Sequence, residues 1–455
     1  MKTYMRLLFA GLLAGLLFLS SCTKDDRFSY SRSSEATAEV KSTVTPQERG
    51  RNVMLLYSAG YNSLYGYLST DIKDLEYGFI PAGTQVGTSP SGHVNGMSEP
   101  VLLVYSRNGY DKDPKAPESA LFRLYRRPDD TVVKDTIKVW GSGADAASEE
   151  TMREVITIAH DLYPASKFGV VFSSHSSGWL PEGYYSDPDA FEKTDWFGVS
   201  ARAFSGKREY PPIPEEYPAV KSFGQDNYPD HSVEMSLKAF ADAIPFCMDY
   251  LLIDACLSGG VEVALQFRGK ADIVAFSQAE ILADGFNYEM LAERLLKGEP
   301  DPVAVARDYY SQYESRTGTQ NSATISVVDT RQMDDLVSVC KTLFEKYRNP
   351  ITKGLKGVTV QGFYRFNRHF FFDLRDILVK AGINASETEA FDAAMDKCII
   401  YKAATPYFFQ GGTDGFKINT FSGLSMYLPA KGTEFLDNYY KGGSILWNEE
   451  TELVK

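Results

Sequence analysis

The sequence predicts an α/β fold built around a mostly parallel sheet that is covered by helices on both faces. Short apolar runs recur along the chain without the two-residue alternation of a half-exposed strand, and stretches with helical spacing separate them. The composition is that of an ordinary globular protein, with 44% hydrophobic and 24% charged residues, and 28 Tyr and 28 Phe can fill a large core. These observations exclude a disordered chain, a coiled coil and a small disulfide-rich protein.

The expected elements alternate along the first 300 residues. Apolar runs predict strands at 53–57, 100–105, 168–172, 250–253 and 273–276, and a hairpin of 120–125 with 131–139 that turns at Pro128-Asp129-Asp130. Helical spacing predicts helices at 61–76, 148–162, 233–244 and 260–267, the second of them capped by Ser148. Residues 180–231 show no periodicity and many Pro, Tyr, Asp and Gly, which predicts a long loop or insertion.

The later part of the chain carries weaker patterns. We expect helices at 302–313, 334–347 and 387–398, and strand-like stretches at 323–328 and 423–428. The predicted organisation has four parts, which are a signal peptide, a flexible tether, a core and a C-terminal extension that either completes the core sheet or forms a second domain. Their boundaries are 1–21, 22–50, 51–300 and 301–455.

The N-terminus has the features of a targeting signal. Lys2 and Arg6 precede an apolar run from residue 7 to 19, which is short for a membrane span but suits a signal peptide. The sequence Leu-Ser-Ser-Cys at 19–22 resembles a bacterial lipoprotein cleavage site, which implies lipidation of Cys22, whereas an ordinary signal peptide with a chance cysteine is the alternative. Residues 23–26 (TKDD) resemble the export signal of surface lipoproteins. We therefore expect an outer membrane lipoprotein exposed at the cell surface.

The charge balance limits the classes of partner. The chain carries 47 Lys and Arg against 60 Asp and Glu, a formal net charge of −13, and it has no basic block. Because affinity for nucleic acid comes largely from contacts of Lys and Arg with phosphates, we expect no nucleic-acid partner. The five cysteines are irregularly spaced without a CxxC motif, which argues against a zinc ribbon or a disulfide framework.

One histidine and one cysteine follow two of the predicted strands directly. His175 follows the strand 168–172, and Cys256 follows the strand 250–253. Because functional groups collect at the carboxyl ends of parallel strands, both side chains are expected at one edge of the sheet. A thiolate is a strong nucleophile, an approaching helix N-terminus would lower the pKa of the thiol, and histidine can protonate a leaving amine. On pattern alone, a nucleophile and base pair competes with two structural residues.

Two segments carry a resemblance to a known family. Residues 172–179 (FSSHSSGW) are similar to the His-Gly-Gly-Gly-Trp segment of the clostripain family, and residues 252–259 (LIDACLSG) resemble its Asp-Ala-Cys-Leu-Met-Gly segment. The segments 260–264 and 271–275, followed by Glu280 and Asp284-Gly285, continue the likeness over residues 50–300. The resemblance implies a caspase-like αβα sandwich, a Cys/His dyad, and cleavage after Arg or Lys.

The resemblance also implies roles for single residues. Cys256 would be the nucleophile and His175 the acid and base, with the backbone amides of Ser176 and Cys256 facing the oxyanion. Ser176 and Ser177 replace glycines of the family pattern, which would strain the backbone if the first position needed a positive φ, and Ser258 replaces a methionine.

Three acidic residues are candidates for binding a basic substrate side chain. Asp254 lies two residues before Cys256, where strand geometry places both side chains on one side of the strand, and a carboxylate there can bind a guanidinium through paired hydrogen bonds. The alternative for Asp254 is a structural carboxylate that binds loop amides. Glu280 and Asp284 follow the strand 273–276 at the same edge and are weaker candidates.

The irregular stretch and the family resemblance raise two further questions, which are proteolytic processing and dependence on calcium. Lys193, Arg202, Lys207 and Arg208 lie in the segment between His and Cys, where clostripain-like enzymes are often cut, although an intact surface loop is the alternative. No cofactor and no metal site are expected, since the acidic residues Asp187, Asp189, Glu192 and Asp195 form no EF-hand-like loop. The family resemblance keeps calcium as the alternative, because some relatives depend on it.

The expected function is therefore that of a surface-anchored cysteine endopeptidase that cleaves after Arg or Lys in protein or peptide substrates through an acyl-enzyme. We expect it to act as a monomer, attached to the membrane by its N-terminal lipid. The alternative, suggested by the serines after His175, is a catalytically inactive caspase-like lipoprotein that binds peptides or glycans.

Overall fold

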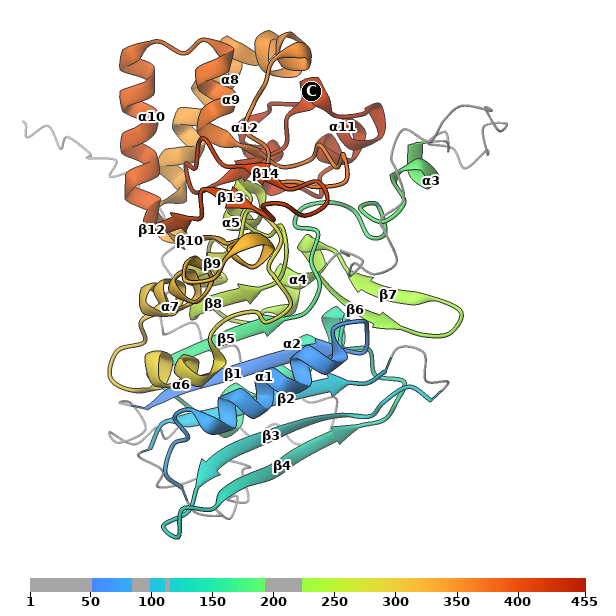
Figure 1. The fold of residues 1–455 in the computed structure, drawn as a ribbon, viewed down its shortest axis with the longest axis vertical. Coiled ribbons are helices and arrows are strands. Elements are labelled where there is room, and N and C mark those ends of the chain that lie inside the picture. The colour runs from blue at the N-terminus through green and yellow to red at the C-terminus, as the bar shows by residue number, and fades with distance from the viewer. Residues whose placement is uncertain (1–50, 84–98, 111–114, 193–222) are drawn as a thin grey trace, which may run out of the picture.

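The centre of the molecule is one nine-stranded sheet with the strand order β12-β10-β9-β8-β5-β1-β2-β3-β4 (Figure 1). The computed structural model describes residues 51–83, 99–110, 115–192 and 223–455, so the predicted signal peptide, tether and lipid site lie outside the described residues. The strands of this sheet are β1 Asn52–Gly60, β2 Val101–Asn108, β3 Ser119–Arg126, β4 Val132–Trp140, β5 Lys167–Ser173, β8 Met248–Asp254, β9 Ala271–Phe276, β10 Thr324–Asp329 and β12 Ile399–Ala404.

The middle of the sheet is parallel and its two margins are antiparallel. Strand β1 pairs in parallel with β2 and β5, and β8 pairs in parallel with β5 and β9. The predicted hairpin β3–β4 extends one margin, and β10 and β12 extend the other. Residues beyond 301 thus contribute two strands to the central sheet. The predicted α/β fold with a mostly parallel central sheet is confirmed.

Helices cover both faces of the sheet, because alternate residues of each inner strand enter two different cores. In β1, Val53, Leu55 and Tyr57 pack into one core, whereas Met54 and Leu56 pack into the other. This explains why the inner strands are continuous apolar runs. The first core is covered by helices α2 Glu149–Leu162, α4 Leu237–Ala243, α5 Val261–Gln266, α8 Met333–Thr352, α9 Leu374–Ala381 and α10 Ala385–Cys398. The second is covered by α1 Tyr65–Tyr77, α6 Tyr288–Leu296 and α7 Pro302–Glu314.

Local signals account for several boundaries. The hydroxyl of Ser148 accepts a hydrogen bond from the amide of Thr151 at 3.2 Å, so the predicted cap of α2 is present. Helix α1 begins at Tyr65 rather than at the expected residue 61, because Asn62 forms a turn in which its side chain accepts from the amide of Leu64 at 2.9 Å.

The stretch expected to be irregular contains regular elements, and the helix expected at 233–244 is shorter than expected. Helix α3 Pro188–Glu192 and strand β6 Phe223–Asn227 lie within 180–231, and β6 pairs with β7 Ser232–Met235. Helix α4 begins only after Ser236, whose hydroxyl accepts from the amide of Ala239 at 3.2 Å. Short polar strands of this kind carry no apolar periodicity, which is why the pattern missed them.

The C-terminal part packs over the end of the sheet that bears β10 and β12 (Figure 1). It holds the small ladders β11 Phe372–Asp373 with β15 Ser425–Met426 and β13 Tyr407–Phe408 with β14 Phe416–Lys417, and the helices α11 Glu434–Lys441 and α12 Leu446–Thr451. The strand expected at 423–428 is confirmed only as β15.

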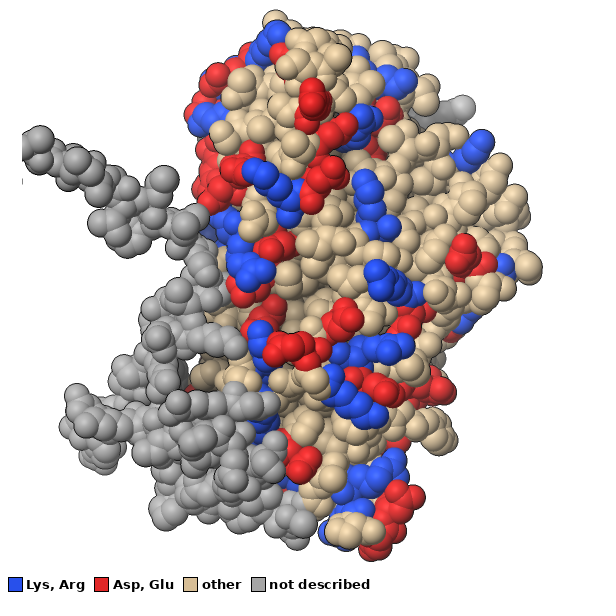
Figure 2. Space-filling model, turned by 90° about the vertical axis from the view of Figure 1, so that its left-hand side faces the viewer, with Lys and Arg blue, Asp and Glu red and all other residues tan. Residues whose placement is uncertain are grey.

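The surface face shown in Figure 2 carries acidic and basic side chains interspersed, without a block of one sign. Within the described ranges, no helix has the length and apolar character needed to cross a bilayer.

Candidate active site

The structure brings the segments of His175 and Cys256 to one point at the carboxyl edge of the sheet. Strands β5 and β8 are parallel neighbours, and Ser173 at the end of β5 stands opposite Asp254 at the end of β8. His175 and Cys256 each follow this pair by two residues. The expectation that the two residues share one edge therefore holds in three dimensions.

His175 is enclosed by three different segments. Its side chain is buried, and its Nε2 lies 3.1 Å from the hydroxyl of Ser63 in the turn after β1. Its backbone carbonyl accepts a hydrogen bond from the amide of Gly224 in β6 at 3.1 Å. The hydroxyl of the preceding Ser174 donates to the carbonyl of Ala59 at 2.6 Å. The histidine segment is thus fixed to both β1 and β6.

Cys256 is a partly buried, free thiol whose sulfur contacts the loop after β9. The amide of Ile281 donates to its Sγ at 3.3 Å. Burial raises the pKa of the Cys256 thiol to about 12 and the nearby Glu280 adds to this, whereas the Ile281 amide and Arg365 act in the opposite direction. The net shift of the Cys256 pKa is therefore upward, opposite to the decrease expected from the approaching helix N-terminus, and burial is its largest cause. The resting form is the neutral thiol.

The backbone around the two residues leaves donors for an oxyanion. Across the described part of the chain, the amides of Ser176 and Cys256 donate to no other residue. Neither Ser176 nor Ser177 has a positive φ, so the replaced glycines bring no backbone strain. The positive φ falls at Gly178, where a Cβ would stand 2.3 Å from the carbonyl oxygen of Leu257.

The serines at two positions that differ from the family pattern contact each other. The hydroxyl of Ser258 donates to that of Ser176 at 2.9 Å, and both side chains are fully buried. The hydroxyl of Ser176 also accepts from the amide of Gly178 at 3.0 Å. This hydrogen bond joins the histidine segment to the cysteine segment.

Asp254 lies beside the site and is held by the loop before α6 and by the first residue of that helix. The amide of Phe286 and the hydroxyl of Tyr288 donate to its Oδ2 at 3.1 Å and 2.6 Å. A Cβ on Gly285, which has a φ of +59°, would stand 2.3 Å from the same oxygen. Burial raises the pKa of Asp254 to about 6, although the bonds from Tyr288 and Phe286 favour the carboxylate. At neutral pH this residue is therefore mainly an anion.

The other two predicted binding carboxylates have basic partners within the chain. Glu280 forms an ion pair with Arg365, and both side chains are nearly buried, with exposed fractions of 9% and 7%. Asp284 pairs with Arg316 at 2.7 Å on a half-exposed surface. Within the described ranges, Asp254 alone of the three has no basic partner.

A fourth acidic residue near Asp254 was not expected from the sequence. Asp71 is buried on α1, and burial raises its pKa to about 9, with further contributions from Asp254, Asp74 and Asp284. The signal was present in the sequence, because Asp71 interrupts the apolar face formed by Leu68, Ile72 and Leu75. Neither Ser63 nor Arg365 was marked by a sequence pattern.

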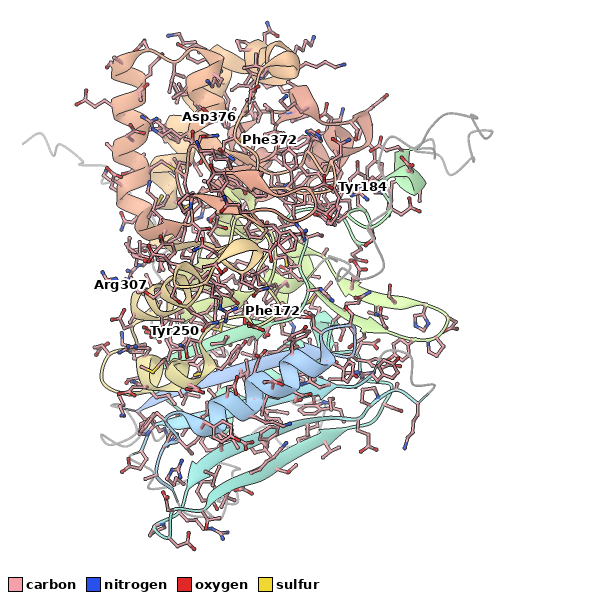
Figure 3. All side chains as sticks on the ribbon, viewed as in Figure 1. Phe172, Tyr184, Tyr250, Arg307, Phe372 and Asp376 are labelled. Carbon is pink, nitrogen blue, oxygen red and sulfur yellow. The ribbon has the colours of Figure 1, made fainter. Side chains whose placement is uncertain are left out.

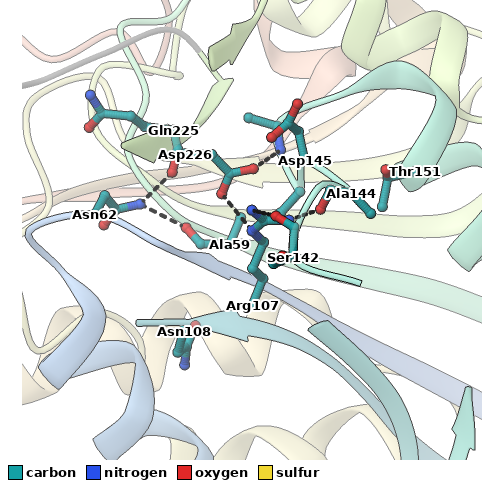
Figure 4. Close-up of polar contacts among 12 residues, drawn as sticks. Ala59, Asn62, Arg107, Asn108, Ser142, Ala144, Asp145, Thr151, Gln225 and Asp226 are labelled. Carbon is teal, nitrogen blue, oxygen red and sulfur yellow. Dashed lines mark hydrogen bonds and ion pairs between the residues drawn. The ribbon is translucent and has the colours of Figure 1, made fainter. Parts of the chain in front are cut away.

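A buried network anchors β6 beside the histidine (Figure 4). Arg107 at the end of β2 faces Asp226 of β6, with 3.5 Å between Nε and Oδ1, and both side chains are fully buried. Burial raises the pKa of Asp226 to about 6, and Arg107 opposes this shift. The amide nitrogen of the Asn62 side chain donates to the carbonyls of Ala59 and Gln225, each at 2.9 Å. The strand that follows residue 222 is therefore fixed to the edge where His175 lies.

The C-terminal part packs against the segment that follows His175. Tyr184 stacks on Phe435 with 5.4 Å between ring centroids, and Figure 3 labels Tyr184 next to this part of the fold. Trp179 packs at a tilt on Tyr427 and edge-on against Tyr440, with 4.9 Å and 5.3 Å between ring centroids. Residues 301–455 therefore support the site as well as the sheet.

The predicted processing segment and the acidic patch fall only partly within the described ranges. The candidate cleavage residues Lys193, Arg202, Lys207 and Arg208, and also Asp195, lie outside the described residues. The carboxylate of Glu192 accepts hydrogen bonds from Tyr184 and Thr433. In the part of the chain that the structure describes, no group of three His, Cys, Asp or Glu side chains could hold a metal ion.

Comparisons with known proteins show which family the sequence resembles and which structures share the fold. The model of the clostripain family (peptidase C11) matches residues 213–434. The fold is similar to an inactive zymogen C11 protease from Parabacteroides distasonis, with 27% identity, a TM-score of 0.65, and coverage of 89% of this chain and 98% of that chain. No curated protein matches the sequence.

Two structures of a secreted C11 cysteine protease from Bacteroides thetaiotaomicron share the fold. One, in complex with an irreversible peptide inhibitor, has 21% identity and a TM-score of 0.64, and the other has 20% identity and a TM-score of 0.66. Each match covers 89% of this chain and 99% of the other. The fold is therefore that of the caspase-like C11 proteases. The chain is thus similar to the clostripain family over residues 213–434 and to a C11 protease in its fold.

Proposed function

We propose that the chain is an endopeptidase that hydrolyses peptide bonds after Arg or Lys, with Cys256 as nucleophile and His175 as acid and base. The observation that carries this proposal is the placement of both residues two positions beyond the facing pair Ser173 and Asp254 on neighbouring parallel strands. The similarity to a family of cysteine proteases supports this reaction class.

The raised pKa of Cys256 determines how the reaction begins. Because the thiol is neutral at rest, His175 takes its proton as Sγ attacks the carbonyl carbon of the substrate. The S–C bond forms, and the amides of Ser176 and Cys256 donate to the negative oxygen. The C–N bond then breaks as His175 gives its proton to the leaving amine. Water, deprotonated by His175, hydrolyses the acyl-enzyme and regenerates the thiol.

Asp254 is the proposed ligand of the basic substrate side chain. Its carboxylate is mainly ionised at neutral pH and is held in place by Phe286 and Tyr288 rather than by a cation. A guanidinium or ammonium group would supply the missing positive charge. We expect Asp254→Asn to lower kcat/KM for Arg and Lys substrates far more than for a neutral substrate.

Mutation of the two reacting residues tests the chemistry. Fluorogenic amides with Arg, Lys or Leu before the scissile bond are incubated with the wild type, Cys256→Ala and His175→Ala. Both variants should lose turnover, whereas Cys340→Ala, which removes a buried thiol of α8, and His231→Ala, at an exposed site, should retain it. Cleavage by Cys256→Ala at the wild-type rate would sink the assignment.

The rival function is a catalytically silent lipoprotein that captures peptides or glycans, and the high pKa of Cys256 favours it. An electrophilic peptide ending in Arg separates the two, and a C11 protease of the same fold is in complex with an irreversible peptide inhibitor. Labelling of Cys256 under reducing conditions supports the peptidase, and binding of the peptide without labelling supports the rival.

We also propose that Cys22 is lipidated and anchors the chain at the outer membrane surface, and that a cut among Lys193, Arg202, Lys207 and Arg208 matures it. The sequence around Cys22 and the four basic residues between His and Cys support these steps. Cys22→Ser should release the protein from the membrane fraction. Mass spectrometry of purified wild type and Cys256→Ala shows whether a cut occurs and whether it is self-made.

A further inference from the structure

The turn between β1 and α1 brings the hydroxyl of Ser63 close to the ring of His175, the proposed catalytic histidine. Ser63 Oγ lies 3.1 Å from Nε2 of His175, which is within hydrogen-bond distance. The side chain of Ser63 is exposed, so its hydroxyl does not fill the core. His175 itself is buried, which makes each hydrogen bond to its ring stronger than it would be in water.

The position of Ser63 is fixed by its neighbour. Asn62 is fully buried, and its side chain donates to the carbonyls of Ala59 and Gln225 (Figure 4). Its side-chain oxygen accepts from the amide of Leu64. All the hydrogen-bonding groups of this side chain are thereby used, and the turn is held against both β1 and β6. A serine at the next position therefore presents its hydroxyl from a rigid support.

We propose that Ser63 is a positioning residue that accepts a hydrogen bond from Nε2–H of His175 and so makes Nδ1 the nitrogen that exchanges the catalytic proton. This inference rests on the proposed function of His175. Nδ1 takes the proton of the Cys256 thiol and later gives it to the leaving amine, while the proton on Nε2 stays in place. The bond to Ser63 is stronger when the ring is charged, so it favours the imidazolium that forms during attack.

Other ionisable groups lie on the elements that pack beside His175. They are Cys256 and Asp254 on the β8 segment, and Asp226 of β6 with its partner Arg107 of β2. A substitution of Ser63 removes none of these four groups. A change in the pH dependence of Ser63 variants is therefore assigned to the titration of His175.

The test compares Ser63→Ala and Ser63→Thr with the wild type and with Ser69→Ala. Ser69 is a partly exposed serine on α1 whose hydroxyl donates to the carbonyl of Tyr65, which makes it a matched control. Turnover of an Arg amide is measured across pH, together with the rate at which iodoacetamide alkylates Cys256. Loss of the hydroxyl should lower kcat about tenfold with KM within about twofold. The limb of both profiles that reports the imidazolium should move to lower pH by about one unit.

The variants separate the possible outcomes. Ser63→Thr, which keeps a hydroxyl at an exposed position, should restore most of the rate, and Ser69→Ala should match the wild type. Unchanged kcat and unchanged profiles in Ser63→Ala would overturn the inference, as would a Ser63→Thr variant as impaired as Ser63→Ala. A wild type without turnover would refute the proposed function instead, and the alkylation profiles would still decide whether Ser63 acts on His175.

Discussion

Removal of Arg365 should expose how strongly a buried ion pair supports the cysteine loop. In Arg365→Met, the apolar stem still packs near the rings of Phe366 and Phe409, which lie 4.7 Å and 4.3 Å from the guanidinium carbon in the wild type. The carboxylate of Glu280, 9% exposed, then stays buried without its cation. Because breaking a buried pair leaves an uncompensated charge, the free energy of unfolding should fall by about 3 kcal/mol or more.

A double substitution provides the matched control. Arg365→Met with Glu280→Gln removes both charges, so most of the stability should return. Urea unfolding of the wild type, both single variants and the double variant gives the coupling free energy. A loss below about 1 kcal/mol in Arg365→Met, or a double variant as unstable as the sum of the single variants, would refute the reasoning. Since Glu280 raises the pKa of Cys256 and Arg365 lowers it, Glu280→Gln should also be alkylated at lower pH, and Arg365→Met only at higher pH.

Three further predictions follow from other buried groups. The pKa of Asp71 is about 9 in the folded chain against an ordinary 3.8, so the folded chain holds a proton that the unfolded chain loses, and stability falls as pH rises between these values. In thermal unfolding, Asp71→Asn should gain up to about 5 kcal/mol at pH 8 and little near pH 4. Ser176→Gly and Ser258→Met should each cost about 1 kcal/mol and be non-additive in a double-mutant cycle, and additive losses would argue against their hydrogen bond. Asp226→Ala should leave Arg107 buried without its partner and cost about 3 kcal/mol, and an unchanged urea midpoint would contradict this.

Much of the central sheet was predictable because its inner strands are buried on both faces. The runs 53–57 and 250–253 are apolar throughout, and Asp130, with a φ of 69°, forms the turn that its sequence indicated. The elements that were missed depend on distant contacts. Strand β6 is short and polar, and it is held by Arg107 and by the carbonyl of His175 rather than by a pattern of its own.

The candidate site likewise contains residues that the sequence predicts and residues that it does not. His175 and Cys256 could be found because strand ends of a parallel sheet meet at one edge, a rule that needs only the order of elements. The groups around them could not be found in this way. Ser63 lies 112 residues from His175, and Arg365 lies 85 residues from Glu280, so these pairs exist only after the chain has folded.

The strand order has a consequence for a chain cut anywhere between residues 193 and 222. Strands β1 to β5 belong to the piece before the cut and β8, β9, β10 and β12 to the piece after it, and the two sets meet where β5 adjoins β8. His175 would then lie in one polypeptide and Cys256 in the other. The products would behave as subunits of a heterodimer with its active site at the subunit interface, so that specific activity would fall on dilution towards the dissociation constant of the two pieces.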